Sequence, residues 1–204
     1  MRSPFIAIAI GIIACLMGIG SAYLVLDGNL RFGKVDLGQW DVWPLAGEPT
    51  ADPYTKAYLA RSGTVWMTVT EGLSLATESD SDGKPLLGSC TYELSGQVPR
   101  GRLWTLAPQG KARSNSAGGI SDVGDGVWDS DLAGDTFISS SDIVWNEDET
   151  LTIMISRVAK PGNWLRLSTP GRFRLMLRIY DTPLTSGALD SAIRTPLITR
   201  RNCA

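Results

Sequence analysis

The chain has 204 residues, of which 43% are hydrophobic and 20% are charged, and its formal net charge is -2 at pH 7. This composition predicts one folded domain and argues against intrinsic disorder and against nucleic-acid binding. The chain contains no histidine, which excludes Ser-His-Asp and Cys-His catalysis and zinc sites built on imidazole. We expect neither a metal site nor a cofactor.

The first segment, from Ser3 to Leu26, is uncharged and mostly apolar. As a helix that rises about 1.5 Å per residue, it is long enough to cross the hydrocarbon core of a bilayer. Arg2 precedes it, so the positive-inside tendency places the N-terminus in the cytoplasm and exports the rest of the chain. We therefore expect residues 1–26 to form a membrane anchor, with lipid contacts along residues 4–26.

Two other interpretations of this segment stay open. A cleaved signal peptide would end at the small residues Gly20, Ser21 and Ala22. A lipoprotein signal would end at Cys15, although the apolar run continues for eleven residues beyond it, which argues against lipidation. Small residues also recur every fourth position, and this spacing lets two membrane helices approach closely. They define a candidate homodimer face at Ala14, Gly18 and Ala22.

Residues 27–51 follow as a polar and aromatic connector, in which Trp40–Trp43 fits a first edge strand. A short helix is predicted next. Asp52 is a favourable N-cap, and Pro53 is well suited to the first helical position because its fixed backbone angle matches the helix. Gly63 then supplies the C-terminal stop.

Strand patterns dominate the predicted domain, residues 52–204. Apolar residues alternate with a period of two in the segments Leu73–Thr77, Cys90–Leu94, Leu103–Ala107, Phe137–Trp145, Leu151–Val158 and Phe173–Tyr180. Turn signals at Asp82-Gly83 and at residues 146–149 predict hairpins that join the strands on either side of each turn. Residues 185–204 are expected to form a surface tail that packs back onto the domain.

The strand Phe173–Tyr180 has apolar side chains on one face and arginines on the other. Neighbours on the same face lie roughly 6.6 Å apart, and guanidinium groups bind carboxylates and phosphates in a bidentate manner. Arg172, Arg174 and Arg178 are therefore a candidate anion-binding site. The alternative is a solvated charged face with acidic neighbours across the sheet.

Two of the three cysteines, Cys90 and Cys203, lie in the part of the chain that we expect to be exported. An oxidising compartment permits a disulfide there. Closing so long a loop would stabilise the fold by about 4–5 kcal/mol in the chain-entropy model. The alternative is two unpaired thiols, one of them buried as a small apolar residue.

The order of several segments resembles that of a known family. The segments are LARSGTVWM, ATESDSDGKPLLGSCTYEL, RLWTLAP, NEDETLTIMIS and PGNWLRLSTPGRFRLMLRIYDTP. Over residues 52–183 the chain resembles the domain of unknown function 1214. The resemblance implies a bacterial, jelly-roll-like antiparallel β-sandwich with one or two short helices. That family often carries a domain of unknown function 1254 as well, whereas this sequence carries an apolar segment instead. The resemblance supplies no reaction and no catalytic residues.

We therefore expect a β-sandwich anchored in a bacterial inner membrane, with its main domain in the periplasm, that binds a partner protein or a glycan without catalysing a reaction. Aromatic side chains dominate binding contacts, and the candidates are Trp104, Trp128, Trp145 and Trp164, although core packing would explain them equally well. The alternative is a carboxylate-dependent enzyme that acts on envelope glycans. Its acids, such as Glu93 and Asp181, would have to lie about 5–10 Å apart.

Overall fold

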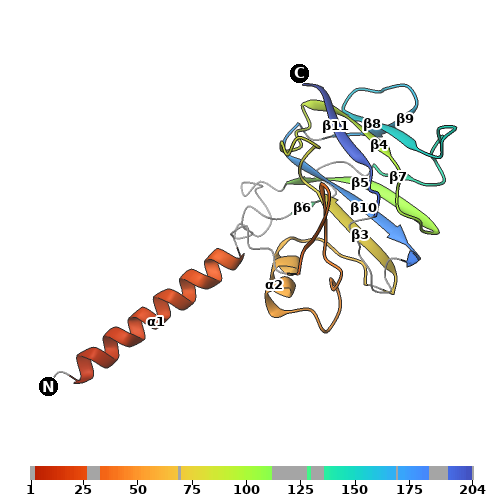
Figure 1. Cartoon of the computed structure of the whole chain (residues 1–204). Helices are drawn as coiled ribbons and strands as arrows, with labels where there is room; N and C mark the ends of the chain where they lie inside the picture. Colours follow the sequence, from red (N-terminus) through yellow and green to blue (C-terminus); the bar gives the residue numbers. More distant parts are fainter. Residues whose placement is uncertain are drawn as a thin grey trace.

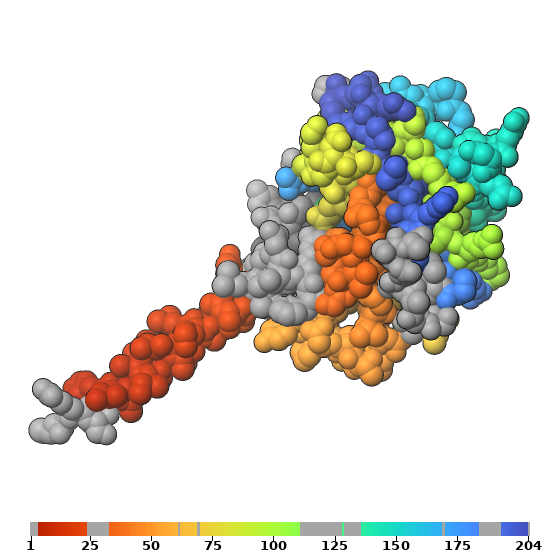
Figure 2. Space-filling model, in the orientation of Figure 1, coloured from red at the N-terminus to blue at the C-terminus, as the bar shows by residue number. Residues whose placement is uncertain are grey.

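The computed structural model describes residues 3–26, 33–68, 70–111, 128–129, 136–168, 170–183 and 193–203. An apolar helix, α1 (Ser3–Leu26), extends away from a β-rich body (Figures 1 and 2). Its stretch Pro4–Tyr23 is long and apolar enough to cross a membrane, as judged by length and composition, and its side chains are exposed. The helix expected from the sequence is therefore present.

In the described part of the chain, the larger sheet of the body has seven strands. In spatial order they are β1 (Val35–Leu37), β2 (Trp40–Val42), β3 (Gly72–Thr77), β10 (Phe173–Tyr180), β5 (Leu103–Lys111) and β6 (Trp128–Asp129), with β7 (Ile138–Ser139) also paired to β5. All of these pairings are antiparallel. β10 lies at the centre, where Leu177 aligns with Leu75 on one side and with Leu106 on the other.

Four strands of the described residues form the smaller sheet, in the order β11 (Leu197–Cys203), β4 (Cys90–Gly96), β8 (Leu151–Ser156) and β9 (Asn163–Arg166). Its pairings are antiparallel except for β8 and β9, which run parallel. The two sheets share one apolar core, and the rings of Tyr92 on β4 and Phe173 on β10 meet there edge to face, 5.8 Å apart. The body is therefore a β-sandwich, as the sequence predicts.

The outer face of the seven-stranded sheet is covered by α2 (Pro53–Arg61) and its flanking segments. Trp43, Leu59 and Trp66 pack there against Ala76 of β3 and Met176 of β10 in a second, smaller core. Because both faces of β10 are covered, the expectation of a half-exposed strand is wrong. Alternation correctly predicted a strand, but it does not show what covers the polar face.

The predicted helix α2 begins and ends as its sequence signals indicate. The Asp52 carboxylate accepts hydrogen bonds from the backbone N–H groups of Tyr54 and Thr55, at 3.0 and 2.9 Å. Two of the amides that an α-helix leaves unpaired at its N-terminus are satisfied in this way. Gly63 follows the helix with a φ of +66°, a value that favours glycine.

Both predicted hairpins are wrong, although both turns form. Gly83 N–H donates to Asp80 C=O at 2.9 Å, and Glu149 N–H donates to Asn146 C=O at 3.2 Å. The strands on either side then enter different sheets: β3 and β4 separate, and so do β7 and β8. Turn chemistry reverses the chain locally, whereas the choice of sheet depends on burial against distant strands.

The sheets include residues of both the predicted connector and the predicted surface tail. The strand expected at Trp40–Trp43 is present as β2, although β1 rather than β2 lies at the edge of the sheet. The predicted connector, residues 27–51, contributes β1 and β2, and Trp40 is completely buried. The predicted surface tail contributes β11, which pairs with β4 and buries Ile198. A disulfide joins Cys90 and Cys203, which face each other across this pair of strands.

Candidate functional site

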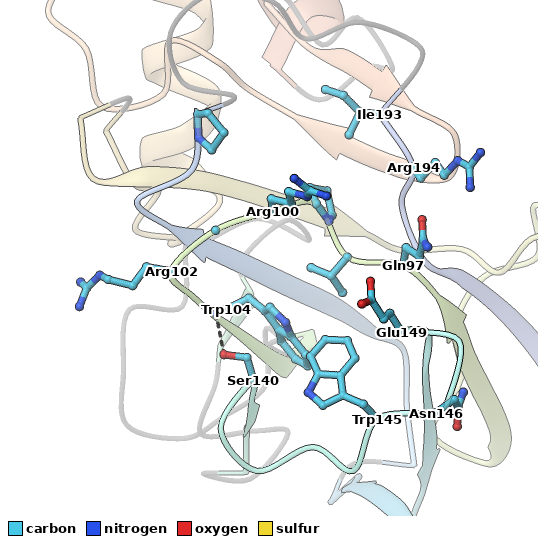
Figure 3. Close-up of a pocket in the computed structure, with 14 residues that line it drawn as sticks. Gln97, Arg100, Arg102, Trp104, Ser140, Trp145, Asn146, Glu149, Ile193 and Arg194 are labelled. Carbon is cyan, nitrogen blue, oxygen red and sulfur yellow. Dashed lines mark hydrogen bonds between the residues drawn. The ribbon is translucent and has the colours of Figure 1, made fainter.

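A pocket with a volume of about 810 Å³ lies at one end of the sandwich. Several chain segments meet there: the connection from β4 to β5, the β7–β8 loop, the end of β10 and the residues that precede β11. Figure 3 shows two indole rings at its centre, those of Trp104 and Trp145. We call it the tryptophan pocket.

The two tryptophans come from different parts of the fold. Trp104 lies on β5 and is only 4% exposed, whereas Trp145 lies in the β7–β8 loop and is 45% exposed. Their rings meet edge to face, with centroids 6.3 Å apart and planes at 85°. Ser140 holds the loop against β5, since its N–H donates to Trp104 C=O at 3.0 Å and its hydroxyl accepts from Trp104 N–H at 3.3 Å. A core tryptophan thus supports a half-exposed one.

The segment that follows β10 holds one wall of the pocket. The Thr182 hydroxyl, which is buried, donates to Arg100 C=O at 2.7 Å. The Asp181 carboxylate pairs with the Arg102 guanidinium at 2.5 Å, and Arg102 N–H donates to Tyr180 C=O at 2.9 Å. The sequence Tyr-Asp-Thr-Pro at residues 180–183, singled out above as part of a family motif, therefore positions the arginine-bearing wall.

The β7–β8 loop is held by its own polar side chains. The Asp148 carboxylate accepts from Thr150 N–H at 3.1 Å and from the Thr150 hydroxyl at 2.6 Å. Both hydrogen bonds lower the pKa of Asp148, and the one from the Thr150 hydroxyl has the larger effect. Asn146 donates through its amide to the Thr150 hydroxyl at 2.9 Å, and Glu149 has a φ of +60°. The tight turn fixes the position of Glu149 at the pocket.

The lining of the tryptophan pocket is cationic. Among the described residues, three arginines and one carboxylate contribute to it, namely Arg100, Arg102, Arg194 and Glu149, and Arg102 is already paired with Asp181. In Figure 3, Arg102 and Arg194 point outward on opposite sides of the indole pair. The side-chain amides of Gln97 and Asn146 add hydrogen-bonding groups. Such a surface suits a polar ligand with negative charge, held against an aromatic ring.

The structure does not bring the three predicted anion-binding arginines together on an open face. Arg174 is 2% exposed. Its guanidinium donates to Gln109 Oε1 at 2.7 Å and to the Thr64 hydroxyl. The same group lies 4.9 Å from the centroid of the Trp128 ring. Arg178 donates to the backbone carbonyl of Val65, and Arg172 is exposed. The prediction of a shared exposed face is wrong because α2 and its flanking segments cover this side of β10.

The other predicted residues are spread over the molecule. Trp128 is buried against Arg174, and Trp164 is partly buried and donates its indole N–H to Ser156. Glu93 lies on β4 and pairs with Arg201, while Asp181 follows β10 in the other sheet. Neither acid lines the tryptophan pocket. Of the four tryptophans, the structure brings together only Trp104 and Trp145.

Sequence reasoning missed the arginines of the pocket wall. Arg100 and Arg102 stand in the segment Pro-Arg-Gly-Arg, residues 99–102, between two predicted strands. Proline and glycine there signal a turn. Two basic residues within a predicted turn were the signal in the sequence that pointed to a cationic surface here. Among the described residues, no group of three or more metal-ligating side chains is found.

Comparison with known families accounts for most of this architecture. The model of the family described as "Protein of unknown function (DUF1214)" matches residues 71–184, more than half of the chain. The chain belongs to the DUF1214 family. The matched range includes both tryptophans of the pocket and the 180–183 segment, whereas Arg194 lies beyond it.

One solved structure shows a similar fold for this DUF1214 chain. The VPA0106 protein from Vibrio parahaemolyticus aligns with a TM-score of 0.50 and 17% identity over 75% of this chain and 36% of its own. A putative uncharacterized protein from Burkholderia cenocepacia aligns with a TM-score of 0.42 and 17% identity over 94% of this chain and 52% of its own. The chain thus spans about a third to a half of these proteins. No curated protein matches it.

Proposed function

We propose that this DUF1214 protein is a membrane-anchored module of the cell envelope that binds an anionic glycan in the tryptophan pocket. The observation that carries the proposal is the half-exposed Trp145 ring, supported by Trp104 in a pocket that Arg100 and Arg194 also line. An exposed indole provides an apolar surface for the C–H face of a sugar ring, and guanidinium groups bind carboxylates. A concave pocket also suits a small or elongated ligand better than it suits the surface of a partner protein.

The geometry favours binding over hydrolysis. A glycoside hydrolase generally requires two carboxyl groups on either side of the scissile bond. Among the described residues that line the tryptophan pocket, one is a carboxylate, Glu149. The pair considered from sequence, Glu93 and Asp181, stands on different sheets, and each acid already has an arginine partner. A carboxylate-dependent enzyme is therefore the weaker candidate.

The envelope location rests on two observations. The helix α1 has the length and apolar composition of a membrane span, and the body contains a disulfide between Cys90 and Cys203. Disulfides persist in oxidising compartments such as the periplasm. Arg2 at the start of the chain supports a cytoplasmic N-terminus. We therefore propose an anchor in the bacterial inner membrane with the β-sandwich in the periplasm.

Ligand binding is tested by titrating the full chain, in a non-ionic detergent, with soluble peptidoglycan fragments, which carry carboxylates, and with neutral maltooligosaccharides. We expect the acidic fragments to change tryptophan fluorescence and the neutral ones to have little effect. Trp145→Ala should weaken binding about tenfold or more, because a contact worth about 1–2 kcal/mol is lost. The Trp145→Ala substitution also removes the fluorescence of Trp145. The affinities of the variant and the wild type should therefore be measured by isothermal titration calorimetry.

The matched control is Trp164→Ala, since Trp164 is also partly exposed but does not line the pocket. It should retain the affinity of the wild type. Equal loss in both variants would contradict a site at Trp145. If no glycan binds the folded wild-type protein, the glycan proposal is wrong, and a protein ligand becomes the better interpretation.

A further inference from the structure

A second pocket, of about 740 Å³, lies at the opposite end of the four-stranded sheet from the tryptophan pocket. Antiparallel topology separates the two. β4 begins at Cys90, which lines the second pocket, and ends next to Gln97, which lines the first. β8 runs the other way and ends at Ser156, in the second pocket. The seven residues of β4 place the two pockets roughly 20 Å apart.

Among the described residues that line the second pocket, three are cationic and none is acidic. The cations are Arg157, Lys160 and Arg166, and we call this site the basic pocket. Among the described residues, none of the three takes part in an ion pair, whereas Arg102, Arg200 and Arg201 each face a carboxylate. The positive charge of the basic pocket is therefore not neutralised from within the described part of the chain.

The backbone that carries these cations is well held. Arg166 ends β9, where it aligns with Ser156 of the parallel strand β8, and its carbonyl accepts from the Thr136 hydroxyl at 2.9 Å. Leu167 N–H continues the pairing by donating to Ser156 C=O at 3.0 Å. Arg157 follows Ser156 directly, so the two arginines start from neighbouring strand ends. Both arginines line the same pocket, so one anion in it can contact both.

Charge decides which anion fits best. Three monovalent cations surround one concavity, and the exposed hydroxyls of Ser89 and Ser168 also line it. A carboxylate would neutralise one of the three charges, whereas a phosphate monoester carries about -1.5 to -2 at pH 7 and offers three acceptor oxygens. Arginine binds phosphate through two parallel N–H donors, and lysine binds it as a point charge.

We propose that the basic pocket binds a phosphate-bearing ligand, independently of the tryptophan pocket. The phosphate could be that of a sugar phosphate or that of a lipid headgroup. The site lies towards the C-terminal end of the chain, on the side of the body away from α1 (Figure 1). That placement favours the sugar phosphate, because the headgroups of the bilayer crossed by α1 would lie on the other side.

The first test measures binding of inorganic pyrophosphate to the full chain in non-ionic detergent by isothermal titration, with sodium chloride of equal ionic strength as the reference. The double variant Arg157→Gln, Arg166→Gln should bind at least about tenfold more weakly, since each lost charge-assisted hydrogen bond is worth about that factor. Lys84→Gln is the control, since Lys84 is an exposed cation that lines neither pocket, and it should bind as the wild type does. Glucose 1-phosphate and a short-chain phosphatidylglycerol then distinguish the two phosphate sources.

The proposal is overturned if pyrophosphate binds the wild type no better than sodium chloride does, or if the double variant keeps its affinity. Equal loss in Lys84→Gln would show a general charge effect and would also overturn it. The melting temperature without pyrophosphate shows whether the double variant folds. If it does not, the single variant Lys160→Gln takes its place and must bind more weakly than the wild type. The glycan titrations do not depend on these outcomes.

Discussion

Arg174 and Arg172 stand two residues apart around β10, and replacing each with alanine should have very different effects. Arg174 is buried, with Gln109, Thr64 and the Trp128 ring around its guanidinium. Arg172 is exposed. The sequence pattern alone treats the two as equivalent members of one charged face, so the comparison tests the tertiary arrangement directly.

The expected magnitude follows from the lost contacts. Hydrogen bonds from a charged donor contribute about 1.5–3 kcal/mol each, and a desolvated cation–π contact about 1–2 kcal/mol. Because these contacts share one side chain, their energies are not additive, and we expect Arg174→Ala to lower the free energy of unfolding by about 3–5 kcal/mol. Arg172→Ala should change it by no more than about 0.5 kcal/mol, as is usual for a surface substitution.

The assay is urea unfolding of the full chain in non-ionic detergent, followed by tryptophan fluorescence. Arg174→Met is a useful third variant, since it keeps much of the apolar stem and removes the donors. It should be less destabilising than Arg174→Ala. Its free energy of unfolding should still be clearly lower than that of the wild type, because Gln109 and Thr64 lose their hydrogen-bond donor. If Arg174→Ala proved as mild as Arg172→Ala, the buried site described here would be refuted.

Two further predictions concern the ends of the domain. Cys203→Ala should lower the free energy of unfolding by about 4–5 kcal/mol in the chain-entropy model, because the disulfide spans a separation of 113 residues; reductant should lower the melting temperature of the wild type and leave that of the variant unchanged. Asp52→Ala should lower the melting temperature at neutral pH. The Thr55 hydroxyl lowers the pKa of Asp52, so the stabilisation is complete above the ordinary aspartate pKa and is lost as the pH falls through the lower pKa of the folded state. The melting temperatures of the two proteins should converge in acid, and a constant difference would contradict this account.

Features that depend on neighbours in sequence were predictable. The apolar run from Ser3 to Leu26 forms α1, and the signals at Asp52, Pro53 and Gly63 bound α2. Alternation located most of the strands, and the family resemblance indicated a sandwich. In each case the cause acts over a few residues: a hydrophobic stretch of sufficient length, a side chain that satisfies the first amides of a helix, or a period of two.

Features that depend on distant residues were decided by the tertiary structure. Whether β3 pairs with β4 or with β10 depends on which surfaces bury the most apolar area, and no local signal reports this. The same holds for Arg174, whose strand pattern predicts an exposed face until α2 covers it. The tryptophan pocket combines residues from β5, the β7–β8 loop and the segment before β11. Sequence alone therefore determined the local elements of this protein, and packing between distant segments determined its sites.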